Sequence, residues 1–302
     1  MAPHHDHEIS KKHLGTAIGL NAIIFVVELI GGIFTNSLAL ISDSIHNLSD
    51  FFALILSYIA ANIVTRNSNH KKTYGYVRVE ILVAFINSLT LVIIGLFIIY
   101  EAVKRIGNPE PVLGLWMLVI AVIGFLANAF STLLLKKDAE HDLNAKSAYL
   151  HLFTDAVESL AVIVVGAIIY FTRWYLLDPI VSIAIGAFII KSAWDILLET
   201  VNILTEGTPK GIDIHEIADM ISSFPEVESV HHIHVWSLSS QFRALSAHVV
   251  VKDRMISNSS QLIHRLNSEL EEKFSINHPT LQLETDVCPE QNVIVNIGKA
   301  KE

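Results

Sequence analysis

Cysteine is nearly absent from the sequence, which contains only Cys288 among its 302 residues. A single thiol cannot form a disulfide framework within the chain, and it cannot supply the several thiolates that a soft metal such as copper(I) prefers. A metal bound by this chain is therefore expected to be held by imidazole nitrogens and carboxylate oxygens.

Charged residues are also scarce, at 17% of the chain, whereas 52% of residues are hydrophobic and the mean hydropathy is +0.49. Soluble domains typically carry about 25% charged residues. The formal net charge is -9, and this lack of basic excess excludes a nucleic-acid partner, since phosphate binding needs a basic face. The polar start precedes an apolar run of spanning length, so we expect no cleaved signal peptide and an integral membrane protein.

Six apolar segments reach the length of about 20 residues that a helix needs to cross the hydrocarbon core of a bilayer. They run from Leu14 to about Phe34, Leu38 to about Val64, Ile81 to Tyr100, Pro111 to Leu135, Ala148 to about Thr172, and about Leu177 to Leu198. Basic residues in the connecting loops are concentrated on the side that holds the chain ends. This bias predicts that both termini are cytoplasmic.

The composition changes after Thr205, where Gly207 and Pro209 indicate a boundary. The pattern that follows predicts a helix at 212–224, strands at 230–238 and 245–251, a helix capped by Asn258 or Ser259 that ends at Phe274, and a strand at 280–287. We therefore expect a histidine-rich cytoplasmic tail at 1–13, a six-helix transmembrane domain at 14–204, a cytoplasmic α+β domain of order α-β-β-α-β at 205–296, and a tail at 297–302.

Two His-x-x-x-Asp pairs lie inside predicted membrane helices, His46 with Asp50 and His151 with Asp155. Spacing of i, i+4 puts both side chains of a pair on one face, one helical turn apart. Two such faces turned toward each other would supply two nitrogens and two oxygens, a set that suits tetrahedral Zn²⁺. Ionisable residues at membrane depth are costly and indicate function, although a helix-packing hydrogen bond within each pair is the simpler alternative.

The charge of this group predicts how it would work. Two aspartates carry about -2, which a divalent ion cancels, whereas the empty site would leave two carboxylates unpaired at a high cost. Protonation of the histidines would relieve that cost, and metal binding would then expel protons. We therefore expect exchange of metal for protons. Glu28, Asp43 and Glu158 either lie near the metal path or are hydrogen-bonded carboxylates of the bundle interior.

Several further motifs carry a resemblance that spans almost the whole chain. They are the stretch from Asn36 to Asp43, the stretch from Tyr74 to Glu80, Asp178-Pro179, the stretch from Glu206 to Pro209, and the stretch from His234 to Ser237. With the two His–Asp pairs, these resemble the cation diffusion facilitator family, and most closely its bacterial zinc, cobalt and cadmium resistance branch.

The resemblance implies a homodimeric metal/proton antiporter that exports metal from the cytosol across the inner (plasma) membrane. The transport site of the family falls on His46, Asp50, His151 and Asp155 of this chain. A site with two histidines resembles that of the zinc-preferring members, and Cd²⁺ and Co²⁺ are possible further substrates. The cytoplasmic domain is implied to have a metallochaperone-like fold and to carry the dimer contact, with no cofactor required.

The resemblance also implies roles outside the membrane. His234 and His248 match positions of regulatory metal sites, which Glu284 could join, although ordinary surface histidines are the alternative. Arg78 resembles a basic residue that pairs with an acid at the domain junction, here Glu206, although an exposed pair is worth at most about 1 kcal/mol. Some members bind a further metal between helices two and three, where this chain offers one histidine beside two lysines, a poor cation site.

Other classes of protein fit less well. A membrane metalloenzyme would need an open coordination position and a general base, as in His-Glu-x-x-His, and the sequence has no such motif. A sensor with a membrane anchor would confine its ligands to the soluble domain. A channel would release ions too slowly from a closed four-ligand site, which favours alternating access instead.

Overall fold

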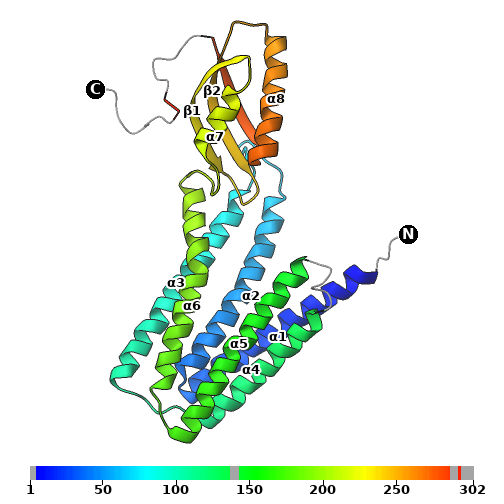
Figure 1. The fold of residues 1–302 in the computed structure, drawn as a ribbon. Helices are drawn as coiled ribbons and strands as arrows, with labels where there is room; N and C mark the ends of the chain where they lie inside the picture. Colours follow the sequence, from blue (N-terminus) through cyan, green and yellow to red (C-terminus); the bar gives the residue numbers. More distant parts are fainter. Residues whose placement is uncertain (1–4, 137–142, 286–291, 294–302) are drawn as a thin grey trace. The chain divides into compact units, whose positions relative to one another are not determined.

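The computed structural model describes residues 5–136, 143–285 and 292–293 (Figure 1). For residues 5–18, 50, 53–54, 57–58, 61, 143–148 and 151 it describes the backbone alone. The chain forms two compact units, one of Met1–Ile59 with Ile86–Ile196 and the other of Ala60–Phe85 with Leu197–Glu302. The side chains of the expected histidine-rich tail at 1–13 lie outside the described part.

Six long helices occupy the first two thirds of the described chain, as expected. They are α1 His5–Thr35, α2 Leu38–Val64, α3 Arg78–Gly107, α4 Gly114–Leu135, α5 Leu143–Thr172 and α6 Leu177–Leu204. Among described residues, α3, α4, α6 and the Leu152–Thr172 part of α5 are long and apolar enough to cross a membrane. Helices α1, α3, α5 and α6 extend beyond their predicted ends, since helical hydrogen bonding continues past the apolar stretch, and α4 begins at Gly114 rather than at the predicted Pro111.

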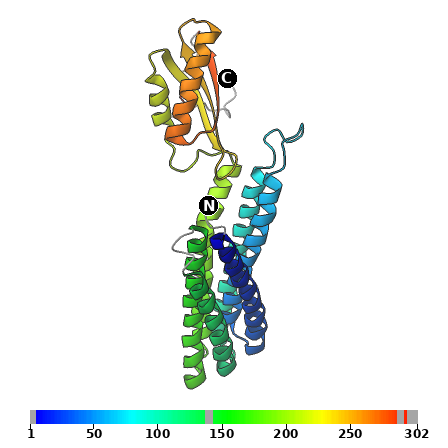
Figure 2. The same ribbon diagram turned by 90° about the vertical axis from the view of Figure 1, so that its right-hand side faces the viewer.

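A small α+β fold follows these helices in the order predicted. Its elements are α7 Ile214–Ser222, β1 Val227–Ser237, β2 Arg243–Val251, α8 Ile256–Phe274 and β3 His278–Glu284. The sheet has the order β1-β2-β3, with β1 antiparallel and β3 parallel to the central β2. Figure 2 shows both helices on one side of this sheet.

Apolar side chains alternate along the strands, so they gather on the one face of the sheet that the two helices cover. Leu245, Ala247 and Val249 of β2 point into a core that α7 fills with Ile217 and Ile221. Leu262, Leu266 and Leu270 of α8 repeat every four residues and are fully buried in the same core. The predicted Asn258 or Ser259 cap of α8 is wrong: the helix begins at Ile256 after Met255, which makes no side-chain capping bond.

A β-bulge interrupts β1 between His231 and His234. His231 pairs with His248, whereas His234 pairs with Ser246, so β1 has one more residue than β2 in this interval. His232 takes a positive φ of 54° there, a conformation that a non-glycine residue adopts only where the surroundings enforce it. The bulge lets Val230 and Ile233 both face the core and keeps His231 on the opposite face.

Close helix packing sets the position of α5 in the first unit. A Cβ atom on Gly114 of α4 would lie 2.8 Å from the backbone nitrogen of Tyr170 in α5, and one on Gly166 would lie 3.1 Å from that of Leu118. Only glycine permits backbones to approach so closely, which is how small residues join membrane helices. Helices α4 and α5 run side by side in both ribbon views (Figures 1 and 2).

The start of α2 is held by a carboxylate of α6. Asp178 is fully buried. Its Oδ1 accepts hydrogen bonds from Ser37 Oγ at 2.6 Å and the Ala39 amide at 3.2 Å, and its Oδ2 accepts one from the Leu38 amide at 2.8 Å. The first amides of a helix have no partner within it, and its positive end favours an anion. Asp178 therefore fixes α2 against α6.

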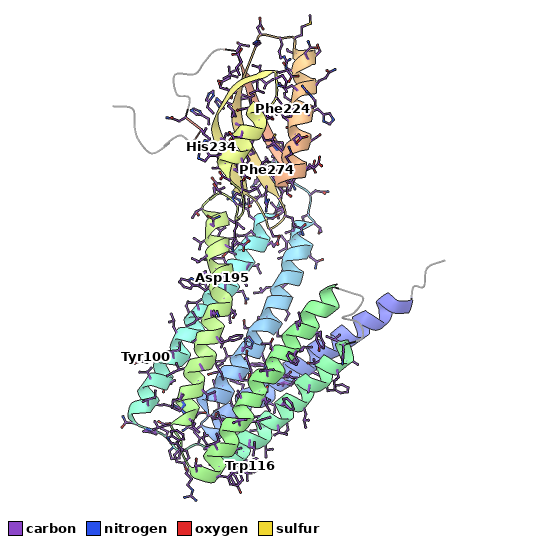
Figure 3. All side chains as sticks on the ribbon, viewed as in Figure 1. Tyr100, Trp116, Asp195, Phe224, His234 and Phe274 are labelled. Atoms are coloured by element: carbon purple, nitrogen blue, oxygen red, sulfur yellow. The ribbon has the colours of Figure 1, made fainter. Side chains whose placement is uncertain are left out.

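We expect Asp178→Ala to destabilise the transmembrane unit strongly, since each buried donor left without an acceptor costs about 1–3 kcal/mol. Asp178→Asn keeps one acceptor oxygen, so its stability should lie between that of the unmodified protein and that of Asp178→Ala. The measurement is the fraction of detergent-solubilised protein that stays monodisperse after heating. Asp195→Ala, at an exposed carboxylate of the same helix (Figure 3), is the matched control. If Asp178→Ala and this control kept the same monodisperse fraction after heating, the role assigned to Asp178 would be contradicted.

Candidate metal centre

His46 of α2 and Asp155 of α5 are brought together inside the first unit. Their exposed fractions are 8% and 1%, and His46 Nε2 lies 3.7 Å from Asp155 Oδ1. Two ligands of a tetrahedral zinc ion are about 3.4 Å apart, given metal–ligand bonds of about 2.0–2.2 Å. The separation therefore suits two ligands that face one ion from different helices.

Asp50 and His151 are the other two residues of the predicted site. Their side chains lie outside the described residues, and their backbones are helical, one turn after His46 in α2 and one turn before Asp155 in α5. Their part in the site remains a prediction.

Glu158 lies close to the same histidine, with its Oε2 3.9 Å from His46 Nε2. It follows Asp155 by three residues on α5, so both carboxylates project from one helix face toward α2. Of the two alternatives that the sequence leaves open for Glu158, this position favours a place beside the metal path.

Glu28 and Asp43 are buried, and each accepts a hydrogen bond from a neighbouring helix. Asn47 Nδ2 of α2 donates to Glu28 Oε2 of α1 at 2.9 Å. Ser159 Oγ of α5 donates to Asp43 Oδ2 at 3.4 Å. These bonds satisfy part of the acceptor capacity of each carboxylate, and they tie α1 and α5 to the α2 segment that carries His46.

Two carboxylates, Asp155 and Glu158, thus lie within 4 Å of the His46 imidazole. Two more, Glu28 and Asp43, are buried in the neighbouring parts of α1 and α2. Anions at this density in a low-dielectric environment are stable only with bound cations or protons. A divalent cation near His46 would supply that charge, with nitrogen and oxygen donors and no thiolate.

A second group of potential ligands lies in the small α+β fold. The ligand atoms of His231, His248 and Glu284 all lie within 4.8 Å of one another. His248 Nδ1 is 2.8 Å from Glu284 Oε1, and His231 Nε2 is 3.4 Å from Glu284 Oε2. One residue from each of three strands therefore forms a set of donors that suits a transition metal.

His234 does not join this group, although it shares the predicted site with His248 and Glu284. It lies opposite Ser246, two residues before His248 on β2. The bulge at His232 instead places His231 opposite His248. Residue alternation alone gives no sign of the bulge, so the sequence interpretation missed His231.

Burial lowers the pKa of His231, whose exposed fraction is 1%. The neighbouring His232 and His248 lower it further, and Glu284 raises it in part. This lowered pKa favours the neutral form of His231, which is the form that binds a metal ion.

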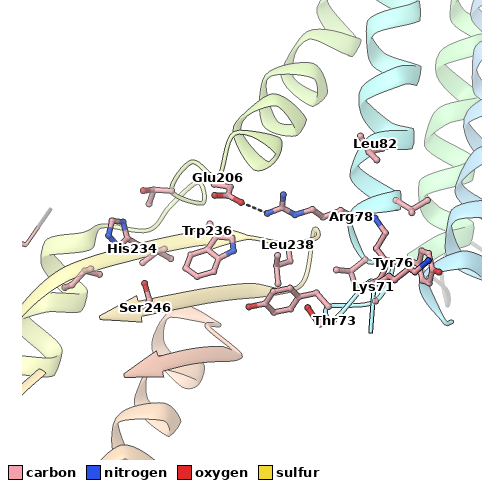
Figure 4. A pocket seen from close by; sticks show the side chains of 18 of the residues that line it. Lys71, Thr73, Tyr76, Arg78, Leu82, Glu206, His234, Trp236, Leu238 and Ser246 are labelled. Atoms are coloured by element: carbon pink, nitrogen blue, oxygen red, sulfur yellow. Dashed lines mark hydrogen bonds and ion pairs between the residues drawn. The ribbon is translucent and has the colours of Figure 1, made fainter. Parts of the chain in front are cut away.

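Arg78 and Glu206 form the ion pair that the sequence predicts. Arg78 Nη2 lies 3.0 Å from Glu206 Oε1 (Figure 4). Exposed fractions of 38% and 64% make it a solvated pair, and such pairs contribute about 0–1 kcal/mol. It links the start of α3 to the segment after α6, and its role as a domain interlock stays a prediction.

Comparison with known proteins gives the class of the chain. Residues 14–205 match the cation efflux transmembrane domain, and residues 209–286 match the cation efflux protein cytoplasmic domain. The chain belongs to the cation efflux family, and the resemblance to cation diffusion facilitators is confirmed. It is therefore an integral membrane protein of a family of transporters.

Two relatives match over nearly their whole length. The "Cadmium, cobalt and zinc/H(+)-K(+) antiporter" of Bacillus subtilis (strain 168) is 37% identical over 98% of this chain and 96% of its own. The "Zinc transporter ZitB" of Escherichia coli (strain K12) is 35% identical over 99% and 97%. Among solved structures, the metal-bound C-terminal domain of the CzcD transporter from Cupriavidus metallidurans covers 24% of this chain and 99% of that one, at 34% identity and a TM-score of 0.22.

Proposed function

We propose that this protein exports a divalent transition metal, zinc first, from the cytosol in exchange for protons by alternating access. The metal binds to His46, Asp50, His151 and Asp155. The observation that carries the proposal is the buried pair of His46 and Asp155 on two separate helices, with ligand atoms 3.7 Å apart.

The surrounding carboxylates explain why protons are exchanged. With metal present, a divalent charge offsets two aspartates, and the ligating histidines are neutral. After the metal leaves, the same aspartates and histidines take up protons, because unpaired charge in the bundle is costly. Loading and emptying the site therefore move protons in the direction opposite to the metal.

The choice of metal follows from the donor set and from the relatives. Two imidazoles and two carboxylates favour Zn²⁺, and the names of the two relatives include zinc, with cadmium and cobalt in one. Four protein ligands leave no open position for a reacting water, so the protein acts as a transporter and not as an enzyme.

The remaining assignments follow the same proposal. The protein is a homodimer through the cytoplasmic domain at 205–296, and it lies in the inner (plasma) membrane with both termini cytoplasmic. Arg78 and Glu206 link the two domains, and their ion pair is the contact that supports this role.

We expect Asp50→Ala and Asp155→Ala each to reduce zinc uptake into proteoliposomes by about 100-fold or more, beyond the 10–100-fold typical of residues that only support metal ligands. Cadmium and cobalt serve as competitor metals in the same assay. Asp195→Ala, at an exposed carboxylate of α6, should transport as the unmodified protein does. Full transport by either site variant would refute the central claim.

Purified protein should release protons on zinc binding, because the ligands bind the metal in their deprotonated forms. A weakly buffered solution with a pH indicator measures the release, and Asp155→Ala should abolish most of it. In proteoliposomes, a proton gradient opposed to zinc movement should accelerate uptake. Zinc binding without proton release, together with transport that ignores the gradient, would exclude the exchange.

We also propose that the cytoplasmic domain binds zinc as a regulatory ligand through His231, His248 and Glu284. This group keeps two of the residues that the sequence predicts and replaces His234 by His231. Its ligand atoms are already within 4.8 Å of one another, so binding requires little rearrangement of the sheet.

Calorimetric titration of the cytoplasmic domain with zinc tests this group. His231→Ala should weaken binding by at least about tenfold, whereas His264→Ala, at an exposed histidine of α8, should leave it unchanged. His234→Ala separates the two ligand sets, since it should bind as the unmodified domain does. A domain that binds no zinc would end the regulatory proposal and leave the transport site unaffected.

A further inference from the structure

A cavity of about 860 Å³ lies within the second compact unit, apart from both groups of metal ligands (Figure 4). Its walls come from residues 71–79, from β1 and from the start of α7. This volume is in the range of about 300–1,000 Å³ that is typical of sites for small molecules. His234 lines the cavity, but it is not part of the group formed by His231, His248 and Glu284. The proposed metal ligands themselves are not among the residues that line the cavity.

The charges that line the cavity are unbalanced. Lys71, Lys72 and Arg78 contribute three positive charges, and Glu206, which contributes one negative charge, is paired with Arg78. Among the described residues no carboxylate forms an ion pair with either lysine. Two ammonium groups are therefore left to attract an anion from outside the chain.

A tight turn fixes the backbone at the two lysines. Asn69 Oδ1 accepts hydrogen bonds from the backbone amides of Lys71 at 2.9 Å and Lys72 at 3.1 Å. The Asn69 and Lys72 backbones also pair with each other. An ordered turn lowers the entropic cost of binding a ligand between neighbouring ammonium groups.

Aromatic and apolar side chains complete the cavity. Tyr74, Tyr76 and Trp236 line it with rings that have one polar edge, a type of side chain enriched where a protein meets the headgroup region of a membrane. Leu82 and Leu238 supply apolar wall. Leu82 is 46% exposed in the first turns of α3, a helix that is apolar and long enough to cross the membrane.

We propose that this cavity binds the phosphate headgroup of an acidic phospholipid, a site distinct from the metal sites. The phosphate oxygens lie against Lys71 and Lys72, and the glycerol and first acyl carbons lie against Leu82. Basic pockets beside membrane helices on the cytoplasmic side bind anionic headgroups in this way. A soluble phosphate would use the same lysines but would gain nothing from the apolar wall, so the two ligands can be told apart.

The test measures phospholipid binding to the full-length protein in detergent by native mass spectrometry, with phosphatidylglycerol compared with phosphatidylcholine. The double variant Lys71→Gln, Lys72→Gln should bind phosphatidylglycerol about 25-fold more weakly, at about fivefold for each lysine. The matched control is Lys210→Gln, Lys252→Gln, which removes the same charge at two exposed positions outside the cavity. Size exclusion confirms that all variants remain folded.

Two further arms separate a lipid from a soluble anion. Leu82→Gln should weaken phosphatidylglycerol binding, and glycerol 1-phosphate should fail to displace the lipid at equal concentration. An equal loss in both double variants would mean general charge attraction and would overturn the proposal. Equal binding of phosphatidylglycerol and phosphatidylcholine by the unmodified protein would also overturn the proposal. The same holds if glycerol 1-phosphate displaces bound phosphatidylglycerol as effectively as added phosphatidylglycerol does.

Discussion

The interaction on which the rest of the molecule depends is the burial of carboxylates inside a bundle of apolar helices. An ionised carboxylate away from water is stable only if hydrogen-bond donors or positive charge compensate it. Asp178 is compensated within the chain, since it accepts three hydrogen bonds at the start of α2. Asp155 and Glu158 differ from Asp178 in their surroundings, since each has an oxygen within 4 Å of the imidazole of His46, a side chain that can also bind a metal ion.

Asp178 and the carboxylates near His46 are linked through the helices that carry them. Asp178 fixes the first turn of α2, and His46 follows two turns later on the same helix. Gly114 and Gly166 bring α5 close to α4, and α5 carries Asp155. The depth and rotation of His46 and Asp155 in the bundle thus depend on helix contacts that other residues make.

Much of this arrangement can be predicted from the sequence, because its causes are local. Apolar length gives the six long helices, residue alternation gives the strands, and the spacing of four residues gives the two His–Asp faces. Asp178 belongs to one of the motifs that carry the family resemblance, but its role in fixing α2 cannot be predicted from the sequence, since its partners lie about 140 residues earlier. His231 was missed for a related reason: its position depends on a backbone bulge at His232, where a positive φ leaves no sign in the sequence.

The parallel pairing of β3 with β2 has a consequence for how the protein is made. Glu284 reaches His231 and His248 only after α8 has crossed over and β3 has been added to the sheet edge. Glu284 follows Leu204, the last residue of α6, by 80 residues. During translation the transmembrane helices therefore leave the ribosome well before the cytoplasmic ligand group can assemble, and a chain truncated before β3 would carry the membrane part without that group.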